Sequence, residues 1–178
     1  MHFAPLESFA PMFELGENKV MRKRVFNPDA ITPRPQFERE WLDLEDLARV
    51  EVTSEDPNFP IESALASGEG PGWRAAEKGK QIIRVVFDNP RTLHRIKLEF
   101  SETEIERTQE FTLRWSAEAV GPFTEIVRQQ WNFSPQGSTS EVEDYQVQLE
   151  NLSILELTLN PDLAPTHTFA TLAQCRLA

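Results

Sequence analysis

The stretch that decides the fold is Leu93-His94-Arg95-Ile96-Lys97-Leu98-Glu99-Phe100, in which apolar and polar residues alternate. Successive side chains of a β-strand point to opposite faces, so this pattern predicts a strand with one buried and one solvent-facing side. The alternation returns in Glu110-Phe111-Thr112-Leu113-Arg114-Trp115-Ser116, which stops near Gly121-Pro122. Both stretches are typical of antiparallel sheets that pack one face on a core.

Working outward from these two strands, further strand-like stretches cover most of the chain after residue 48. They lie at 49–53, 81–87, 123–133, 142–149, 153–159 and 168–177, and turn signals such as Asp88-Asn89-Pro90 separate them. About eight short strands with regular turns predict an all-β antiparallel jelly-roll sandwich. The one helix-like stretch is Glu40 to Ala48, with Trp41, Leu44 and Leu47 on one side.

The alternation also assigns each side chain to a face of the sandwich. The residues expected to point mainly inward are Leu93, Ile96, Leu98, Phe100, Phe111, Leu113, Trp115, Val147, Leu149, Leu155, Leu157 and Leu159. The polar residues between them, Lys97, Glu99, Thr112, Arg114 and Glu156, are expected to face solvent.

Residues 1–40 differ from the rest, because they hold five prolines and the basic cluster Arg22-Lys23-Arg24. Proline removes an amide donor, so we predict an extended N-terminal arm at 1–40, followed by one sandwich domain at 41–178. The basic cluster is either a binding patch or a solvated run that pairs with the acidic body. The arm also offers a route to a homo-oligomer.

Composition excludes several classes of partner. The chain has 29 acidic and 18 basic residues, a net charge of -11, which disfavours nucleic acid and anionic membrane surfaces. The single cysteine, Cys175, rules out an intramolecular disulfide and is expected to be a buried, inert thiol. No secretion signal or membrane span is visible, so the expected location is cytoplasmic.

Five segments, taken in order, resemble the discoidin or coagulation-factor type C domain family, whose members have a galactose-binding-like jelly roll. These segments are 61–65, Gly72-Trp73-Arg74-Ala75-Ala76, 81–90, 93–96 and 111–116, and the resemblance covers roughly residues 48–178. It implies a non-catalytic module that binds sugars, lipid headgroups or proteins through loops. Sugar-binding members often hold calcium in an Asp-Gly turn followed by Thr before the Trp. That turn is missing before Trp73, where only Glu62 and Glu69 supply carboxylates, so no metal is predicted.

Strand parity predicts where a ligand binds. If successive strands are antiparallel, the longer connections near 55–80, 101–109, 132–141 and 160–168 gather at one end, away from the shorter turns and the C-terminus. That end offers a sugar-binding set: Trp73 and Trp131 as flat apolar faces, and Arg74, Arg107, Asn132 and His167 as hydroxyl-binding groups.

Structural roles compete with each assignment. Trp73 and Trp131 are also suited to the core, Arg107 to an ion pair with Glu104 or Glu106, and His167 to a solvated loop. The structure must choose between these alternatives.

No catalytic motif is visible. The histidines His2, His94 and His167 are widely separated, and neither a phosphate loop nor a nucleophile elbow is present, so no catalytic residue and no cofactor are predicted. The leading hypothesis is a carbohydrate-binding, lectin-like module. The alternative is an intracellular protein-interaction module of the same fold, and an enzyme that uses carboxylates is a third, weaker hypothesis.

Overall fold

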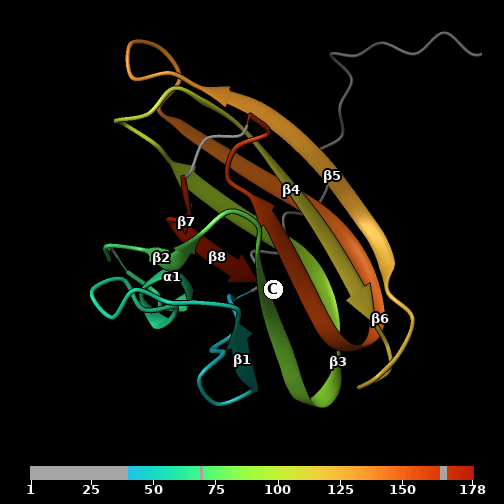
Figure 1. Ribbon diagram of the computed structural model, residues 1–178. Coiled ribbons are helices and arrows are strands. Elements are labelled where there is room, and N and C mark those ends of the chain that lie inside the picture. Colours follow the sequence, from blue (N-terminus) through green and yellow to red (C-terminus); the bar gives the residue numbers. More distant parts are fainter. Residues whose placement is uncertain (1–39, 69, 165–167) are drawn as a thin grey trace, which may run out of the picture. The chain divides into compact units, whose positions relative to one another are not determined.

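The computed structural model describes residues 40–178 apart from 69 and 165–167. The predicted N-terminal arm, its basic cluster and its role in oligomerisation lie outside the described residues and remain predictions. The regular secondary structure of the described residues is almost entirely strand, as the alternation predicted (Figure 1).

The described residues form eight strands and one short helix. In chain order these are β1 (Ala48–Val52), α1 (Glu62–Leu65), β2 (Trp73–Lys78), β3 (Gln81–Ser101), β4 (Arg107–Ser116), β5 (Thr124–Phe133), β6 (Ser140–Asn160), β7 (Phe169–Leu172) and β8 (Gln174–Leu177). All strand pairings among the described residues are antiparallel. Six strands form one sheet in the order β1-β3-β6-β4-β5, with β8 added to β3, and β2 pairs with β7.

This sheet folds over into two layers because β3 and β6 each bend in the middle and contribute to both. Residues 81–86 of β3 pair with 154–159 of β6, which also pairs with β4, while residues 95–101 of β3 pair with 140–146 of β6 and with β8. Figure 1 shows both ribbons turning sharply at one end of the molecule. The stretches expected as separate strands at 81–87 and 93–100, and at 142–149 and 153–159, are therefore halves of two long strands.

The local sequence explains the bends. Between Val86↔Ile154 and Arg91↔Leu152 the β3–β6 register shifts, and the unpaired β3 residues include Asp88-Asn89-Pro90. Proline has no amide hydrogen to donate to a ladder. On β6 the turn falls at Asn151, whose φ of 57° is in the left-handed region that asparagine tolerates better than most residues.

The core lies between the layers and contains the residues that the alternation assigned to it. Leu93, Ile96, Leu98, Phe111 and Leu113 are at most 1% exposed, while Trp115 and Val147 are partly buried and pack against the core from its margin. Cys175 is buried among these side chains, and burial raises the pKa of its thiol to about 12, in agreement with an inert cysteine.

Two residues that the alternation placed in solvent are buried, and the first is Glu156, whose side chain is fully buried. Register explains this, because Arg84 and Arg114 lie opposite Glu156 on the two neighbouring strands and both bind its carboxylate. The ring of Phe123 lies 5.9 Å from the Arg84 guanidinium carbon and 5.2 Å from that of Arg114. Thr112, also expected in solvent, is buried nearby at 7% exposure.

The predicted helical stretch at 40–48 is reduced to a single turn. The amides of Leu47 and Ala48 bond the carbonyl of Leu44 at 3.2 and 3.1 Å, and residues 40–43 are extended. The helix of the described chain is α1, whose four residues are too few to give a periodic pattern.

Candidate functional site

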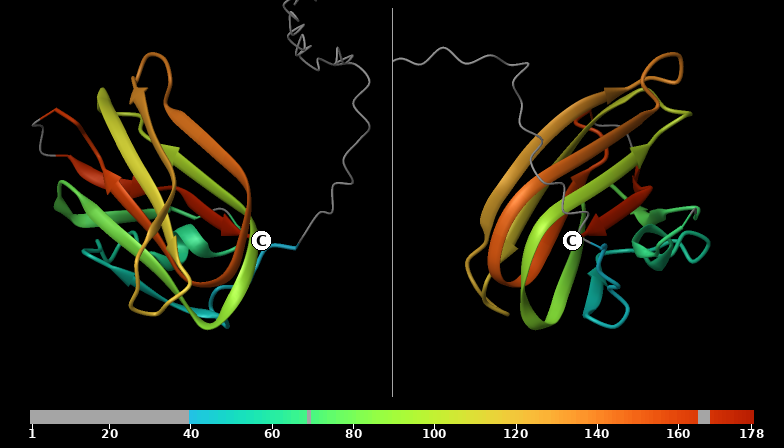
Figure 2. Two further views of the ribbon diagram at one scale, coloured as in Figure 1. Left: turned by 90° about the vertical axis from the view of Figure 1, so that its right-hand side faces the viewer. Right: turned by 180° about the vertical axis from the view of Figure 1, so that it is seen from behind.

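The long connections gather at one end of the sandwich, as strand parity predicted. The amide of Glu102, in the β3–β4 connection, bonds the carbonyl of Thr139, in the β5–β6 connection, at 2.8 Å, and Leu163 after β6 bonds Thr108 at 2.9 Å. Figure 2 shows the β3–β4 and β5–β6 connections at one end of the sandwich, and the β3 bend with the β4–β5 connection at the other end. We call the first end the long-connection pole.

A pocket of about 330 Å³ opens at this pole. Its walls come from the connection before β2, from the β3–β4 connection and from β7: Phe59, Pro71, Trp73, Arg74, Ser101, Glu102, Thr103, Glu104, Ile105, Arg107, Phe169, Thr171, Leu172 and Ala173. Its volume lies at the lower end of the range of about 300–1,000 Å³ that is typical of small-molecule sites.

Arg74 is the polar group of the pocket that is free to bind a ligand. Its guanidinium carbon lies 4.7 Å from the ring centre of Phe169 and 5.9 Å from that of Phe59, and Lys78 also approaches Phe169. Such cation–π contacts orient a guanidinium without using its N–H donors. Within the described part of the chain, Arg74 forms no ion pair, so these donors remain available.

The backbone holds these groups in place. The amide of Arg74 donates to the carbonyl of Phe59 at 3.1 Å, and the Arg74 carbonyl accepts from Asp56 at 2.9 Å. Arg74 also pairs with Thr171 in the β2–β7 ladder. Two aromatic residues far apart in sequence are thereby brought to the same arginine.

Arg107 supports the pocket from beneath. It is 4% exposed, forms an ion pair with Glu102 at 3.1 Å and donates to the carbonyl of Phe169 at 2.9 Å. Burial lowers the pKa of Arg107, and the carboxylates of Glu102 and Asp162 oppose that change. The partners expected from the sequence, Glu104 or Glu106, were wrong: Arg107 forms its ion pair with Glu102, and this pair ties the β3–β4 connection to β7.

The two tryptophans have core positions, which was the competing role for each. Trp73 is 1% exposed, so neither face of its indole can stack on a ligand. Trp131 packs on Phe100 and Phe111 at ring distances of 5.2 and 5.1 Å, and it does not line the pocket. Backbone crowding also restricts the turn before Trp73, because Gly72 has a φ of +72° and an added Cβ would lie 2.7 Å from the carbonyl oxygen of Leu172.

Asn132, another predicted residue, does not line the pocket. Asn132 is exposed on β5, where its side-chain oxygen accepts a hydrogen bond from the Thr108 hydroxyl at 2.6 Å. His167 lies outside the described residues. Of the six candidates, the structure thus brings Trp73, Arg74 and Arg107 to the pocket and leaves Arg74 with free donors.

Sequence reasoning missed several pocket residues, above all Phe59 and Phe169. Phe59 stands in the irregular run Asn58-Phe59-Pro60, which has no period, and Phe169 begins the short strand β7. The signal available for both was an aromatic residue within a predicted long connection.

Across the described ranges, no group of three or more His, Cys, Asp or Glu side chains is arranged to hold a metal ion. No helix among these residues has the length and apolar character needed to cross a membrane.

No protein-family model and no curated protein matches this chain. Solved structures do match. The family 32 carbohydrate-binding module (CBM) of C. perfringens NanJ, in complex with galactose, is 13% identical with a TM-score of 0.56, and the alignment covers 77% of this chain and 96% of that one. The fold is the galactose-binding-like jelly roll. The CBM32 of AlyQ, in complex with 4,5-unsaturated mannuronic acid, has this fold at 16% identity and a TM-score of 0.57, covering 79% of this chain and 98% of that one.

The jelly roll also occurs as one part of a longer catalytic chain. Truncated AlyQ, which has CBM32 and alginate lyase domains, is 15% identical with a TM-score of 0.51, and the alignment covers 78% of this chain but 32% of that one. The described domain therefore corresponds in size to a module and not to a whole enzyme of this kind.

Proposed function

We propose that this chain is a non-catalytic carbohydrate-binding module that binds sugar in the pocket at the long-connection pole. The observation that carries this proposal is the guanidinium of Arg74, which contacts the rings of Phe59 and Phe169 and keeps its N–H donors free. Sugar binding needs an apolar surface for the pyranose ring and planar polar groups for its hydroxyls, and this pocket provides both. The solved modules of the same fold that bind galactose or mannuronic acid support the assignment.

The pocket residues would contact a sugar in different ways. Phe169 offers an apolar edge, Arg74 donates hydrogen bonds to hydroxyl or carboxylate oxygens, and the exposed carboxylate of Glu104 accepts from hydroxyls. Arg107 acts as a positioning residue, because both of its terminal guanidinium nitrogens are already bound, to Glu102, Phe169 and Thr171.

The carboxylates of the pocket give little support to an enzyme. Glycoside hydrolysis uses two carboxyl groups that flank the scissile bond. Of the two glutamates that line this pocket, Glu102 is bound to Arg107 and its side chain is 12% exposed. This leaves Glu104 as the accessible one, which suits a binding role.

The test is a glycan array with the full chain, followed by calorimetry of the best glycan on Arg74→Ala, Phe169→Ala and Arg128→Ala. Arg128 is an exposed arginine on β5 outside the pocket and serves as the matched control. We expect each pocket variant to bind about 5- to 30-fold more weakly, the loss of one charged hydrogen bond or one aromatic contact, and the control to bind as the parent does. Unchanged affinity in both pocket variants would remove this site.

The protein-interaction module stays the alternative prediction, together with a cytoplasmic location. A pull-down with and without residues 1–40 separates it from sugar binding. Recovery of a specific partner by a chain that binds no glycan on the array would favour it.

A further inference from the structure

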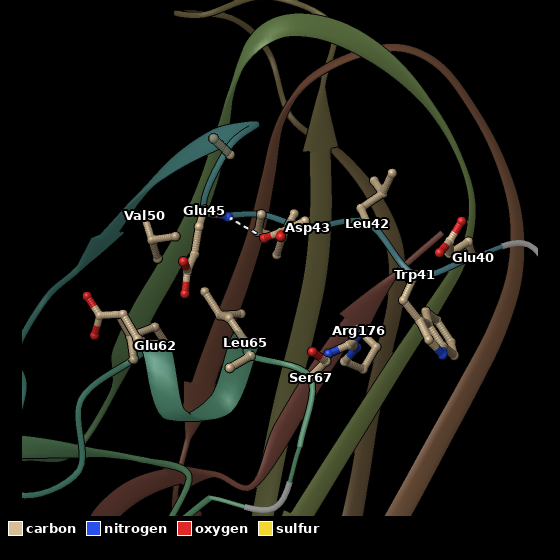
Figure 3. A pocket seen from close by; sticks show the side chains of 14 residues that line it. Glu40, Trp41, Leu42, Asp43, Glu45, Val50, Glu62, Leu65, Ser67 and Arg176 are labelled. Atoms are coloured by element: carbon tan, nitrogen blue, oxygen red, sulfur yellow. Dashed lines mark hydrogen bonds between the residues drawn. The ribbon is translucent and has the colours of Figure 1, made fainter.

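A groove of about 790 Å³ shares no lining residue with the sugar pocket. Its walls are the extended segment that leads into β1, β1 itself, α1 and the end of β8. The amide of Leu42 bonds the carbonyl of Leu177 at 2.8 Å and fixes the segment to β8. The floor is apolar and includes Leu42, Val50 and Leu65, all partly buried (Figure 3).

Four carboxylates line this groove: Glu40, Asp43, Glu45 and Glu62. All four residues are exposed, and none of them forms an ion pair within the described part of the chain. Some carboxylates on the sheets are instead bound to cations, as Asp144 is to Arg95 and Glu156 to Arg84. The groove therefore carries uncompensated negative charge over an apolar floor.

The other end of the groove is lined by an arginine and a tryptophan instead of carboxylates alone. Figure 3 shows Glu45 and Glu62 toward one end, Leu65 between, and Arg176 toward the other. The guanidinium carbon of Arg176 lies 5.8 Å from the Trp41 ring centre, and that of Arg95 lies 4.9 Å from it. Two arginines thus contact Trp41, and the positive charge of the groove lies at this end.

We propose that this groove is a second binding site, for a peptide segment in which lysine or arginine alternates with large apolar side chains. The apolar side chains cover Leu42, Val50 and Leu65, and the cationic groups bind the carboxylates of Glu45 and Glu62. A ligand without a cation would desolvate these carboxylates with no compensation, and an anionic ligand would be repelled. Charge complementarity therefore selects a basic, apolar peptide. The site is independent of the proposed sugar binding.

The test uses the full chain and fluorescein-labelled hexapeptides followed by fluorescence anisotropy. A Leu-Lys repeat is the ligand probe, a Leu-Glu repeat tests the charge, and a Gly-Lys repeat tests the apolar floor. We expect the Leu-Lys peptide to bind most tightly, to weaken between 0.05 and 0.5 M salt, and to leave the sugar pocket unoccupied. If the Leu-Glu peptide binds as well as the Leu-Lys peptide, the interaction is unspecific adhesion and the proposal fails.

Variants locate the site. Glu45→Gln with Glu62→Gln removes two groove carboxylates, and Glu77→Gln with Glu150→Gln removes two exposed carboxylates elsewhere, with the same change in net charge. We expect the first pair to weaken the Leu-Lys peptide by at least about threefold and the second pair to have no effect. Equal losses in both would show a general charge effect, and no loss in the first would place the peptide elsewhere. Either result overturns the proposal.

Discussion

Replacing Glu156 by glutamine should destabilise the fold markedly, although the change alters a single atom of the side chain. The carboxylate accepts hydrogen bonds from Arg84 Nε at 2.8 Å, from Arg114 Nε at 3.1 Å and from Arg114 Nη2. A glutamine amide turns N–H donors toward guanidinium donors, so at least one of these bonds is lost and two cations lose their shared anion.

The magnitude follows from burial. Removing one partner of a fully buried ion pair costs about 3–5 kcal/mol. The Glu156 side chain is 0% exposed, but those of Arg84 and Arg114 are each 40% exposed, so water can solvate them again and the cost is smaller. We expect a loss of about 2–3 kcal/mol in the free energy of unfolding, and a fall in Tm of roughly 4–12 °C for a domain of this size.

The pH dependence gives a second, independent measurement. Burial favours a raised pKa for Glu156, but the hydrogen bonds and charges of Arg114 and Arg84 outweigh it and lower the pKa. A carboxyl whose folded pKa is depressed stabilises the fold above its unfolded value of about 4.3, and this contribution is lost as the pH falls through the folded pKa. The difference between the parent and Glu156→Gln should therefore be constant from pH 7 to about 4.3 and shrink below that.

Urea unfolding followed by circular dichroism measures both quantities. Glu51→Gln is the matched control, because Glu51 lies 3.9 Å from Arg84 with its side chain 47% exposed, and this change should cost less than about 0.5 kcal/mol. If Glu156→Gln is as stable as the control, or if its deficit does not depend on pH, the ion pairs do not hold this face of the sheet.

Three further predictions concern other parts of the domain. Arg107→Met leaves Glu102 without its cation and should cost about 2 kcal/mol in thermal unfolding, with weaker glycan binding because the β3–β4 connection is released from β7. Cys175 should resist a thiol reagent at pH 8 and react at the unfolded rate in urea; rapid labelling of the folded protein would contradict its burial. Asp144→Asn breaks an ion pair whose side chains are 37% and 36% exposed and should cost less than about 1 kcal/mol by urea unfolding, the difference vanishing in 0.5 M salt.

The sequence predicts the scaffold well because alternation is a local property. The alternation places Ile96, Leu98 and Phe100 on one face, and each of them is at most 1% exposed in the structure. Leu93 is out of phase with them, and it is buried as well because the register shifts between Leu93 and Arg95. Glu156 obeys the same rule and points away from the core, yet it is buried. Its cover comes from cross-strand neighbours, and the pairing register that brings Arg84 and Arg114 beside it cannot be derived from alternation alone.

The sequence predicted part of the candidate site. Parity located the pole, and Arg74 followed from an arginine in a long connection. The sequence analysis chose Trp73 and Trp131 as the aromatic residues of the site. The sequence does not show whether the tryptophan at the start of β2 points outward to a ligand or inward to the core. Phe59 and Phe169 take that place through the β2–β7 pairing, which joins segments at opposite ends of the domain sequence.

Because β3 and β6 each run through both layers, neither layer can come apart without disrupting strands of the other. Denaturation of the described domain should accordingly be all-or-none, with no half-sandwich populated on the way. The layers are thus joined by β3 and β6, and the connections at the long-connection pole join strand ends without linking the layers in this way. Exposed residues of these connections, such as Thr103 and Glu104, can therefore be exchanged with little change in the free energy of unfolding, whereas the buried pair of Arg107 and Glu102 cannot.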